Sequence, residues 1–406
     1  MIKKNKILFI VDNFPPEVNA PARRSYEHIQ EWVKHGKEVT VITSFPNFPK
    51  GKIFDGYKNK FYKKEILNGI IIYRVWTYIS ENKGFLRRIL DYMSFGFMSF
   101  IIGLFIKTDL IIATSPQFFS AISGNFLSFF KRKPWIFEVR DIWPESIKAV
   151  GSLQNGFIYK FLEWVEIKLY KSSEKIIVVT DSFKENIIKK GIVGSKIFVH
   201  KNGYLSDNII LNSSKNLKLR NKLNLKNKFI IAYIGTLGLA HSLSFVLRCL
   251  PSIYNKNNKI HFLIIGDGAE KKNLLDLKNK LKLKNITFLP IMNQNKVSKY
   301  LSLMDASLVN LKKSNTFKSV IPSKIFEAAA YNKPIILGVE GESKKIISKF
   351  NAGICFEPEN KNEFINSCLN ISVKKKYKSF DSGLKNLREK FDRKKIAISM
   401  LNDILN

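Results

Sequence analysis

Short apolar runs alternate with amphipathic segments along the whole chain. In the first half, runs of strand length bounded by breaker residues lie at 7–11, 38–43, 70–76, 109–113, 135–139 and 175–180. Helical spacing of apolar residues marks 22–35 and 156–171 between them. Strands that alternate with helices predict βαβ units, and hence a parallel sheet covered by helices.

The second half repeats this pattern. After a polar stretch at 206–226, strand-length runs lie at 229–234, 261–265, 286–289, 306–310 and 335–339, and helical spacing returns at 380–406. These runs predict a second parallel sheet of five strands. The fold class is therefore α/β, with two Rossmann-like domains.

The length of the chain predicts the number of domains, but its net charge does not identify the partner. A chain of 406 residues is too long for one ordinary core and fits two domains of about 200 residues each. The net charge of +35, from 68 Lys and Arg against 33 Asp and Glu, suggests an anionic partner. The excess is spread along the chain, so charge alone does not choose between nucleic acid, a lipid surface and phosphorylated substrates.

Cysteine usage and the N-terminal residues indicate a cytoplasmic protein. Cys249, Cys355 and Cys368 have no metal-ligand spacing and lie in apolar or helical contexts, as reduced core thiols do. The apolar run at 7–11 is too short for a signal peptide and is predicted to be the first strand.

The segment 85–106 is rich in aromatic and aliphatic residues. Its uncharged part, 92–106, is shorter than the roughly 20 residues that span a bilayer, and Arg87, Arg88 and Asp91 precede it. One interpretation is a core helix of the first domain, and the other is a helix lying on a membrane. The aromatic density and flanking basic residues favour peripheral attachment to an anionic membrane surface.

The segment 320–339 combines a helix start, a cation and a carboxylate. Ser323 is predicted to cap the helix, so that an anion can lie at its positive end. Lys324 adds a mobile charge there, and Glu327, one turn further, can accept hydrogen bonds from a vicinal diol such as ribose. This pattern predicts a site for a nucleoside diphosphate. The alternative is an ordinary capped helix followed by a buried strand.

The motifs around this segment occur in an order typical of one family. They are Asn13-Phe14-Pro15-Pro16-Glu17, the run Glu138-Val139-Arg140-Asp141-Ile142-Trp143-Pro144-Glu145-Ser146, Gly235-Thr236-Leu237-Gly238, Gly266-Asp267-Gly268, residues 322–334 and Asn351-Ala352-Gly353-Ile354. With them the chain resembles the retaining nucleotide-sugar glycosyltransferases of family 4, within the branch that builds bacterial O-antigen and exopolysaccharide and includes N-acetylfucosaminyltransferase-like members.

The resemblance implies the two-domain GT-B fold and a division of labour between its domains. Residues 1–203 would bind the acceptor, residues 204–380 would bind the nucleotide sugar, and residues 381–406 would form a helix that crosses back to the first domain. The donor site would lie beyond the carboxyl ends of the strands of the second domain. Its expected residues are Gly235, Thr236, Gly238, His241, Gly266, Pro290, Ser323, Lys324, Ile325 and Glu327.

Within this set the sequence leaves some roles open. The turn at Gly266 can be a contact site or simply a tight turn. Ser319 stands where relatives carry the first acid of a Glu-x7-Glu pair. Thr236 and His241 stand where many relatives carry Arg and Lys, so the diphosphate charge would fall on Lys324, the helix start and His241.

The resemblance also indicates an acceptor face in the first domain. Expected acceptor-binding residues are Pro16, Glu17, Asn19, Arg23, Arg140 and Trp143. Asp141 and Glu145 could orient the acceptor hydroxyl or take its proton, and with Lys324 they form the candidate catalytic set. The alternative is that Arg140, Asp141 and Glu145 form a structural ion-pair network.

These observations predict a metal-independent enzyme without a cofactor. It would transfer a sugar from a UDP-sugar to a saccharide linked to undecaprenyl diphosphate, at the inner face of the plasma membrane. No Asp-x-Asp metal motif and no recognised nucleic-acid-binding motif occurs. A sugar-nucleotide epimerase of the same architecture is the alternative. A dehydrogenase is disfavoured because no Gly-x-Gly-x-x-Gly follows the first strand.

Overall fold

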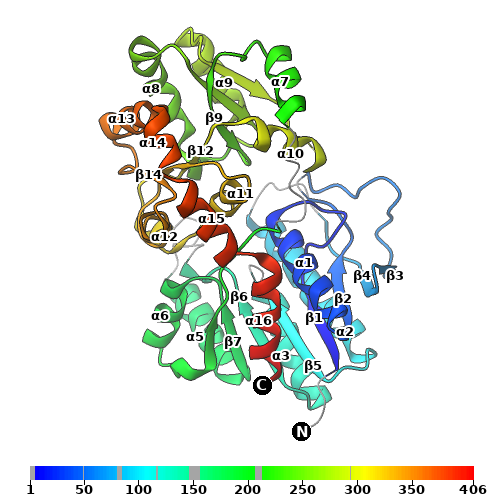
Figure 1. Cartoon of the computed structure of the whole chain (residues 1–406). Coiled ribbons are helices and arrows are strands. Elements are labelled where there is room, and N and C mark those ends of the chain that lie inside the picture. Colours follow the sequence, from blue (N-terminus) through cyan, green and yellow to red (C-terminus); the bar gives the residue numbers. More distant parts are fainter. Residues whose placement is uncertain are drawn as a thin grey trace. The chain divides into compact units, whose positions relative to one another are not determined.

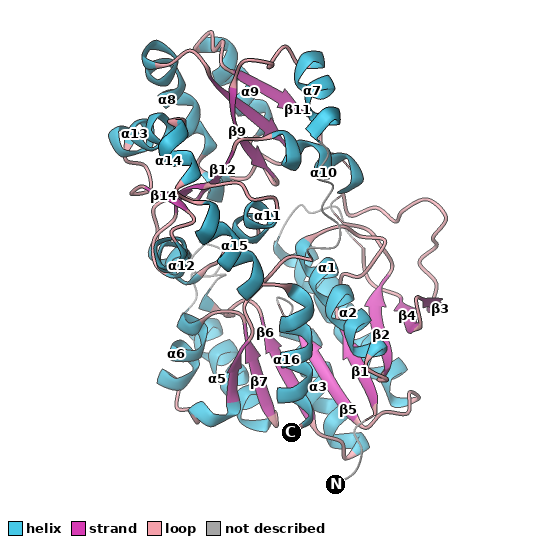
Figure 2. Cartoon of the chain, in the orientation of Figure 1, coloured by secondary structure: helices cyan, strands magenta, loops and turns pink. Residues whose placement is uncertain are grey.

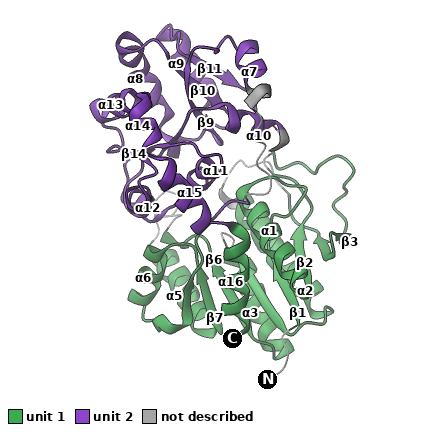
Figure 3. Cartoon of the chain, viewed as in Figure 1, with its two compact units in different colours: residues 1–201, 393–406 green, residues 202–392 purple. Residues whose placement is uncertain are grey.

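The computed structural model describes residues 5–48, 50–79, 85–115, 118–145, 156–205, 213–292 and 294–406. The chain divides into two compact units, one formed by residues 1–201 with 393–406 and the other by residues 202–392 (Figure 3). Strands and helices alternate through both units (Figures 1 and 2). Each unit is described by itself below.

The first unit contains an eight-stranded sheet in the order β3-β4-β2-β1-β5-β6-β7-β8. All neighbours are parallel except β3, which is antiparallel to β4. The strands are β1 (Lys6–Ile10), β2 (Glu38–Ser44), β3 (Tyr62–Leu67), β4 (Ile70–Val75), β5 (Leu110–Thr114), β6 (Trp135–Val139), β7 (Lys175–Val178) and β8 (Ile197–Val199). The central strands are apolar throughout because helices cover both faces of the sheet.

Two sets of helices pack on the two faces of this sheet. Ile7 and Phe9 of β1 face a core shared with α1 (Ala20–Lys34) and α16 (Arg393–Leu405). Leu8 and Ile10 face the other way, because successive side chains of a strand alternate between faces. The helices on that second face are α2 (Phe85–Leu104), α3 (Phe118–Lys131), α5 (Gly156–Ser172) and α6 (Asp181–Lys189), and the short 3-10 helix η1 (Gly194–Lys196) precedes β8.

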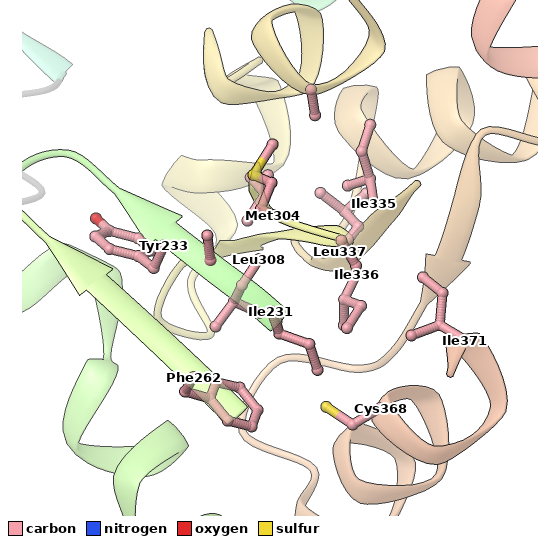
Figure 4. Close-up of a cluster of buried hydrophobic side chains, with 14 of the residues drawn as sticks. Ile231, Tyr233, Phe262, Met304, Leu308, Ile335, Ile336, Leu337, Cys368 and Ile371 are labelled. Carbon is pink, nitrogen blue, oxygen red and sulfur yellow. The ribbon is translucent and has the colours of Figure 1, made fainter. Parts of the chain in front are cut away.

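The second unit contains a six-stranded, fully parallel sheet in the order β11-β10-β9-β12-β13-β14. Its strands are β9 (Phe229–Ile234), β10 (Ile260–Ile265), β11 (Ile286–Leu289), β12 (Ala306–Asn310), β13 (Ile335–Gly338) and β14 (Gly353–Cys355). Its helices are α7 (Ser213–Lys222), η3 (Leu239–His241), α8 (Leu243–Lys256), α9 (Lys271–Lys280), α10 (Gln294–Leu303), η4 (Asn315–Ser319), α11 (Lys324–Ala330), α12 (Glu342–Phe350), α13 (Lys361–Ile371), α14 (Lys374–Lys378) and α15 (Asp381–Lys390). Figure 4 shows side chains of β9, β10, β12 and β13 converging in its core.

The predicted α/β class with two parallel sheets is confirmed, and the differences lie at the sheet edges. The second sheet has six strands rather than the predicted five, because the three-residue β14 adds to its edge. In the first unit β3 and β8 were not predicted. The first is exposed and lysine-rich and the second has three residues, so neither shows the apolar run of a central strand.

The C-terminal segment is not one crossover helix. Residues 381–406 were predicted to form a single helix, but α15 ends at Lys390 and belongs to the second unit, while α16 begins at Arg393 and belongs to the first. The long segment at 85–106 forms α2, as predicted. None of the helices in the described ranges is long and apolar enough to cross a membrane.

Buried polar contacts fasten α16 to the first unit. Trp32 of α1 donates its indole N–H to the carbonyl of Ala397 at 2.9 Å, and the buried Arg393 pairs with Glu27 of α1. Near the other end of α16, His200 lies 2.9 Å from the carboxylate of Asp403. A buried ion pair contributes little net stability, but removing one partner leaves an uncompensated charge.

Substitution Glu27→Ala tests this attachment. We expect it to lower the free energy of unfolding by about 3–5 kcal/mol, because the buried Arg393 loses its carboxylate. The exposed pair between Lys6 and Glu38 provides the control, and Glu38→Ala should cost less than about 1 kcal/mol. Denaturant unfolding of both variants gives the comparison. Equal losses would show that α16 is not held by this pair.

Candidate functional site

The strand order of the second sheet reverses direction between β9 and β12. From β9 the chain continues to β10 and β11 on one side, and then returns to β12 on the other. In doubly wound sheets a crevice opens beyond the carboxyl ends of the strands at this point, and ligands bind there. Gly235 directly follows β9, and Asn310 ends β12.

The loops that follow β9 and β10 lie in direct backbone contact. A Cβ atom on Gly266 would lie 1.8 Å from the carbonyl oxygen of Gly235, and one on Gly268 would lie 2.4 Å from that of Leu237. The amide of Leu237 donates to the carbonyl of Asp267 at 2.8 Å. The turn at Gly266 is therefore a packing support for the first loop, in line with the tight-turn interpretation of the sequence.

Lys324 lies against the backbone of Gly235. A Cβ atom on Gly235 would come within 2.8 Å of both Cε and Nζ of Lys324, so a residue with a side chain would displace the lysine. Gly235 also has a φ of +146°, which favours glycine. Nζ lies 4.9 Å from the ring centroid of Tyr233, a cation–π distance. Burial lowers the pKa of Lys324, whereas the charge of Glu327 raises it.

A hydrogen bond and packing in the core fix the ring of Tyr233. Its hydroxyl donates to the carbonyl of Thr236 at 2.6 Å, and its side chain is buried in the core shown in Figure 4. Tyr233 was not among the predicted site residues, because in the sequence it is one of several apolar residues of strand β9. The structure shows that it supports the ammonium group of Lys324.

His241 belongs to the same cluster but carries no charge near neutral pH. Its ring centroid lies 5.7 Å from that of Tyr233. Burial, and then the charge of Lys324, lowers its pKa to about 4. Asn310 donates to the carbonyl of His241 at 2.9 Å, which fixes this turn to the end of β12. His241 can therefore offer hydrogen bonds to an anion but not a second positive charge.

The start of α11 differs from the prediction. Ser323 occupies the N-cap position, but its side chain makes no capping hydrogen bond, so that part of the prediction is wrong. The amide of Ile325 donates to the carbonyl of Pro322, and those of Phe326 and Glu327 donate to Ser323. Because these amides are already engaged and α11 has only 7 residues, Lys324 is the principal group available to an anion here.

The remaining predicted donor residues are spread around this centre. Ile325 is fully buried, so only its backbone could contact a ligand. Thr236 is exposed, and Gly238 has room for a side chain. Pro290 is exposed and follows the edge strand β11, two strands away from β9. Ser319 donates to the carbonyl of Thr316, so a hydroxyl rather than a carboxylate lies at this position.

In the first unit, several predicted acceptor residues hold the loop after β1 and the start of α1. Glu17 is buried and accepts hydrogen bonds from the amides of Asn47 and Phe48, and burial raises its pKa to about 7. Asn19 caps α1 by accepting from the amide of Ala22 at 2.9 Å. Arg23 lies 3.6 Å from a carboxylate oxygen of Glu27. The adjacent Pro16 is exposed.

The segment after β6 is also well packed. Ser115 accepts from the amides of Arg140 at 2.7 Å and Asp141 at 3.2 Å. Burial lowers the pKa of the Arg140 guanidinium to about 10. Trp143 stacks on Phe118, with ring centroids 6.2 Å apart, and is half-buried. Trp143 therefore packs on α3 rather than projecting into solvent.

The two candidate acceptor-side carboxylates have different surroundings. Glu145 lies 3.0 Å from the ammonium of Lys190, which also pairs with Glu166 at 2.7 Å. Both oxygens of Glu145 accept from Asn186. Glu145 thus belongs to an ion-pair network, but its partners are Lys190 and Asn186 rather than the Arg140 and Asp141 of the alternative interpretation. Asp141, whose amide contacts Ser115, is half-buried.

A further group of carboxylates lies near the end of β1 in the first unit. Asp91 of α2 lies close enough to Asp12 and Glu17 to be affected by their charges, and burial with these charges raises its pKa to about 8. Asp12 lies two residues after the end of β1, a position that could have drawn attention to it in the sequence. The proximity of Asp91 could not be predicted, because Asp12 and Asp91 lie on separate elements.

In the described part of the chain no group of three or more His, Cys, Asp or Glu could hold a metal ion.

Comparison with known proteins places this geometry in a class. Residues 215–380 match the family model described as "Glycosyl transferases group 1". The chain is 24% identical over 365 residues to "Putative colanic acid biosynthesis glycosyl transferase WcaI" of Escherichia coli (strain K12), covering 87% of this chain and 89% of that protein. It is 22% identical over 202 residues to "Putative teichuronic acid biosynthesis glycosyltransferase TuaH" of Bacillus subtilis (strain 168), covering 50% and 49%.

The fold has close counterparts among solved structures. The crystal structure of Anabaena Alr3699/HepE in complex with UDP and glucose superposes with a TM-score of 0.73 over 98% of both chains, at 17% sequence identity. The predicted GT-B fold is confirmed. Together with the match over residues 215–380, it supports a glycosyltransferase of the GT-B class.

Substitution Gly266→Ala tests the support of the first loop. We expect it to destabilise the protein by about 3 kcal/mol, because its Cβ atom would overlap the carbonyl oxygen of Gly235. Gly238→Ala is the matched control, since a Cβ atom there meets nothing closer than 3.8 Å. Thermal unfolding of both variants measures the difference. A Gly266→Ala variant as stable as Gly238→Ala would contradict the proposed contact.

Proposed function

We propose that the protein is a retaining, metal-independent glycosyltransferase that transfers a sugar from a UDP-sugar to a lipid-linked saccharide. One observation carries the proposal: the ammonium group of Lys324 is held against Gly235 and Tyr233 at the point where the strand order of the second sheet reverses. A half-buried cation at this position fits the diphosphate of a nucleotide sugar.

The charge that develops in such a transfer lies on the departing diphosphate. The bond between the anomeric carbon and the phosphate oxygen breaks, and its electron pair leaves with UDP. Lys324 stabilises that charge, while the neutral His241 donates or accepts a hydrogen bond beside it. The acceptor hydroxyl oxygen forms the new bond to the anomeric carbon, and Asp141 is the proposed group that orients this hydroxyl or takes its proton.

The nucleotide part would be bound by Glu327 and the loop after β11. Glu327 lies one turn after Lys324 on α11 and acts electrostatically on it. A carboxylate there suits the two hydroxyls of ribose. The main chain around Pro290 is the proposed contact of the base, as the resemblance to family 4 implies. The structural neighbour solved with UDP and glucose supports a UDP-sugar as donor.

The acceptor and pathway rest on the relatives. The names of two relatives refer to colanic acid and teichuronic acid biosynthesis, which supports a role in assembling a bacterial polysaccharide. We propose an O-antigen, capsule or exopolysaccharide precursor on undecaprenyl diphosphate as acceptor, and an N-acetylated deoxyamino sugar as one candidate donor group. The protein would act at the inner face of the plasma membrane, attached peripherally through α2.

Substitutions of Lys324 and Glu327 test the two halves of the donor site. We expect Lys324→Ala to lower kcat/KM by about 100- to 1000-fold, because the diphosphate loses its charge partner. Glu327→Ala should lower the preference for UDP over 2′-deoxy-UDP as an inhibitor by about tenfold or more, because the ribose hydroxyl loses a charged hydrogen bond. Steady-state kinetics with a panel of UDP-sugars and a lipid-linked acceptor provides both values.

The exposed Lys344 on α12 supplies the control for the loss of one positive charge. Lys344→Ala should keep wild-type turnover, and thermal unfolding should show that all three variants are folded. Wild-type turnover in Lys324→Ala would refute the site. A product formed from the donor alone, without acceptor, would indicate an epimerase instead.

Metal removal tests the metal-independent reaction. We expect turnover to be unchanged in EDTA and not to rise on addition of Mg²⁺ or Mn²⁺. The reason is that Lys324 stabilises the charge on the departing diphosphate, as a metal ion does in other transferases. Strict dependence on Mn²⁺ would contradict this mechanism.

A further inference from the structure

The outer surface of α2 and α3 in the first unit is unusually rich in exposed aromatic side chains. On their inner sides both helices pack on the sheet through buried residues such as Phe95 and Leu127. On their outer sides lie Phe97, Phe126, Phe129 and Phe130, and Phe105 directly follows the end of α2; all five are exposed, with Phe105 83% and Phe129 77% accessible. We call these five residues the phenylalanine face. A helix that is apolar on both sides is normally buried on both.

Ring contacts join α2 to the members of the phenylalanine face on α3. Gly96 and Gly103 of α2 let α3 approach closely. A Cβ atom on Gly96 would lie 2.8 Å from Phe119, and one on Gly103 would lie 2.5 Å from Leu127. The ring of Phe100 contacts both Phe126 and Phe130, with centroids 6.1 and 5.5 Å apart. The two helices therefore present their outer aromatic residues side by side. Exposed apolar patches of this kind mark interaction surfaces.

A basic groove adjoins this face. It has a volume of about 600 Å³ and is lined by Phe130, by Lys6, Lys107, Lys131 and Lys133, and by one carboxylate, Asp109. We call it the lysine groove. Because Phe130 belongs to both, a ligand in the groove lies directly beside the aromatic residues.

The single carboxylate of the lysine groove, Asp109, does not balance the positive charges of its lysines. Asp109 accepts hydrogen bonds from the amides of Lys6 and Asn5, and these bonds, with smaller contributions from the charges of Lys133 and Lys6, lower its pKa. Lys6 pairs with Glu38 at 3.6 Å, whereas Lys107 and Lys133 form no ion pair within the ranges that the structure describes. The groove is thus positive and suits an anionic group such as a phosphate.

The sequence composition of the two helices favours a lipid surface as the occupant. Residues 118–131 contain no Asp or Glu, and residues 92–107 contain none either. A second copy of a chain with a net charge of +35 would be repelled, whereas an anionic bilayer would be attracted. Phenylalanine side chains enter the boundary between headgroups and acyl chains, and adjacent lysines bind the headgroup phosphates.

We propose that the phenylalanine face inserts into an anionic membrane and that the lysine groove binds the phosphate of a lipid headgroup. This proposal deepens the proposed function, on which it rests for the membrane-borne acceptor. It assigns docking to a surface built by α2 and α3 together, with a defined phosphate site, rather than to the single helix α2.

The full-length chain should be tested by sedimentation with vesicles of phosphatidylcholine alone and of phosphatidylcholine with phosphatidylglycerol. We expect the wild type to bind the anionic vesicles, and more weakly at high salt. Lys107→Glu with Lys133→Glu should lower the partition coefficient by about 25-fold or more, at about fivefold per lost charge. Phe105→Ser with Phe129→Ser should lower it by about 100-fold, at about tenfold per ring.

Matched controls lie outside the proposed surface. Phe61→Ser removes an aromatic residue that is 61% exposed beside β3, and Lys374→Glu with Lys375→Glu reverses two charges on α14 of the second unit. Neither should change vesicle binding. Wild-type vesicle binding by both test variants, equal losses in the controls, or a concentration-dependent dimer that the phenylalanine substitutions abolish would each overturn the proposal.

This test is separable from that of the donor site. The variants of the face and groove should keep wild-type turnover with a water-soluble acceptor analogue, and Lys324→Ala should keep wild-type vesicle binding. Loss of vesicle binding by Lys324→Ala would show that docking needs the donor site and would contradict a surface confined to the phenylalanine face and the lysine groove.

Discussion

The backbone contact between Gly235 and Gly266 is the constraint on which the candidate donor site depends. No side chain fits at either position, because a Cβ atom would meet Lys324 at the first and a carbonyl oxygen at the second. The contact brings the loops after β9 and β10 together at the point where the strand order reverses. Lys324 then lies directly on the backbone, with its ammonium group near the ring of Tyr233.

This arrangement concentrates the positive charge of the site in one group. Burial lowers the pKa of both Lys324 and His241, and His241 is neutral near pH 7. The amides at the start of α11 are engaged in its first turn. A ligand diphosphate would consequently depend on Lys324 more than on the helix start, which is the reverse of the emphasis that the sequence suggested.

The central strands could be predicted because they have a local signature, and a local signature also predicts an anion site at Lys324, a role that stays a prediction. An apolar run between breakers indicates a buried strand, and a lysine at a helix start indicates an anion. Partners distant in sequence have no such signature. Glu145 pairs with Lys190, Asp91 lies near Asp12, and Tyr233 supports Lys324, and none of these contacts could be predicted. The exposed edge strand β3 was missed for a related reason, since it buries no continuous apolar run.

The affinity for UDP compared with that for uridine measures how far Lys324 binds the diphosphate. Calorimetry on the wild type and Lys324→Ala isolates the contribution of the diphosphate, because uridine lacks it while ribose and base are unchanged. We expect the wild type to bind UDP much more tightly than uridine, and Lys324→Ala to lose most of this difference while binding uridine as before. The same preference for UDP in both proteins would contradict this expectation.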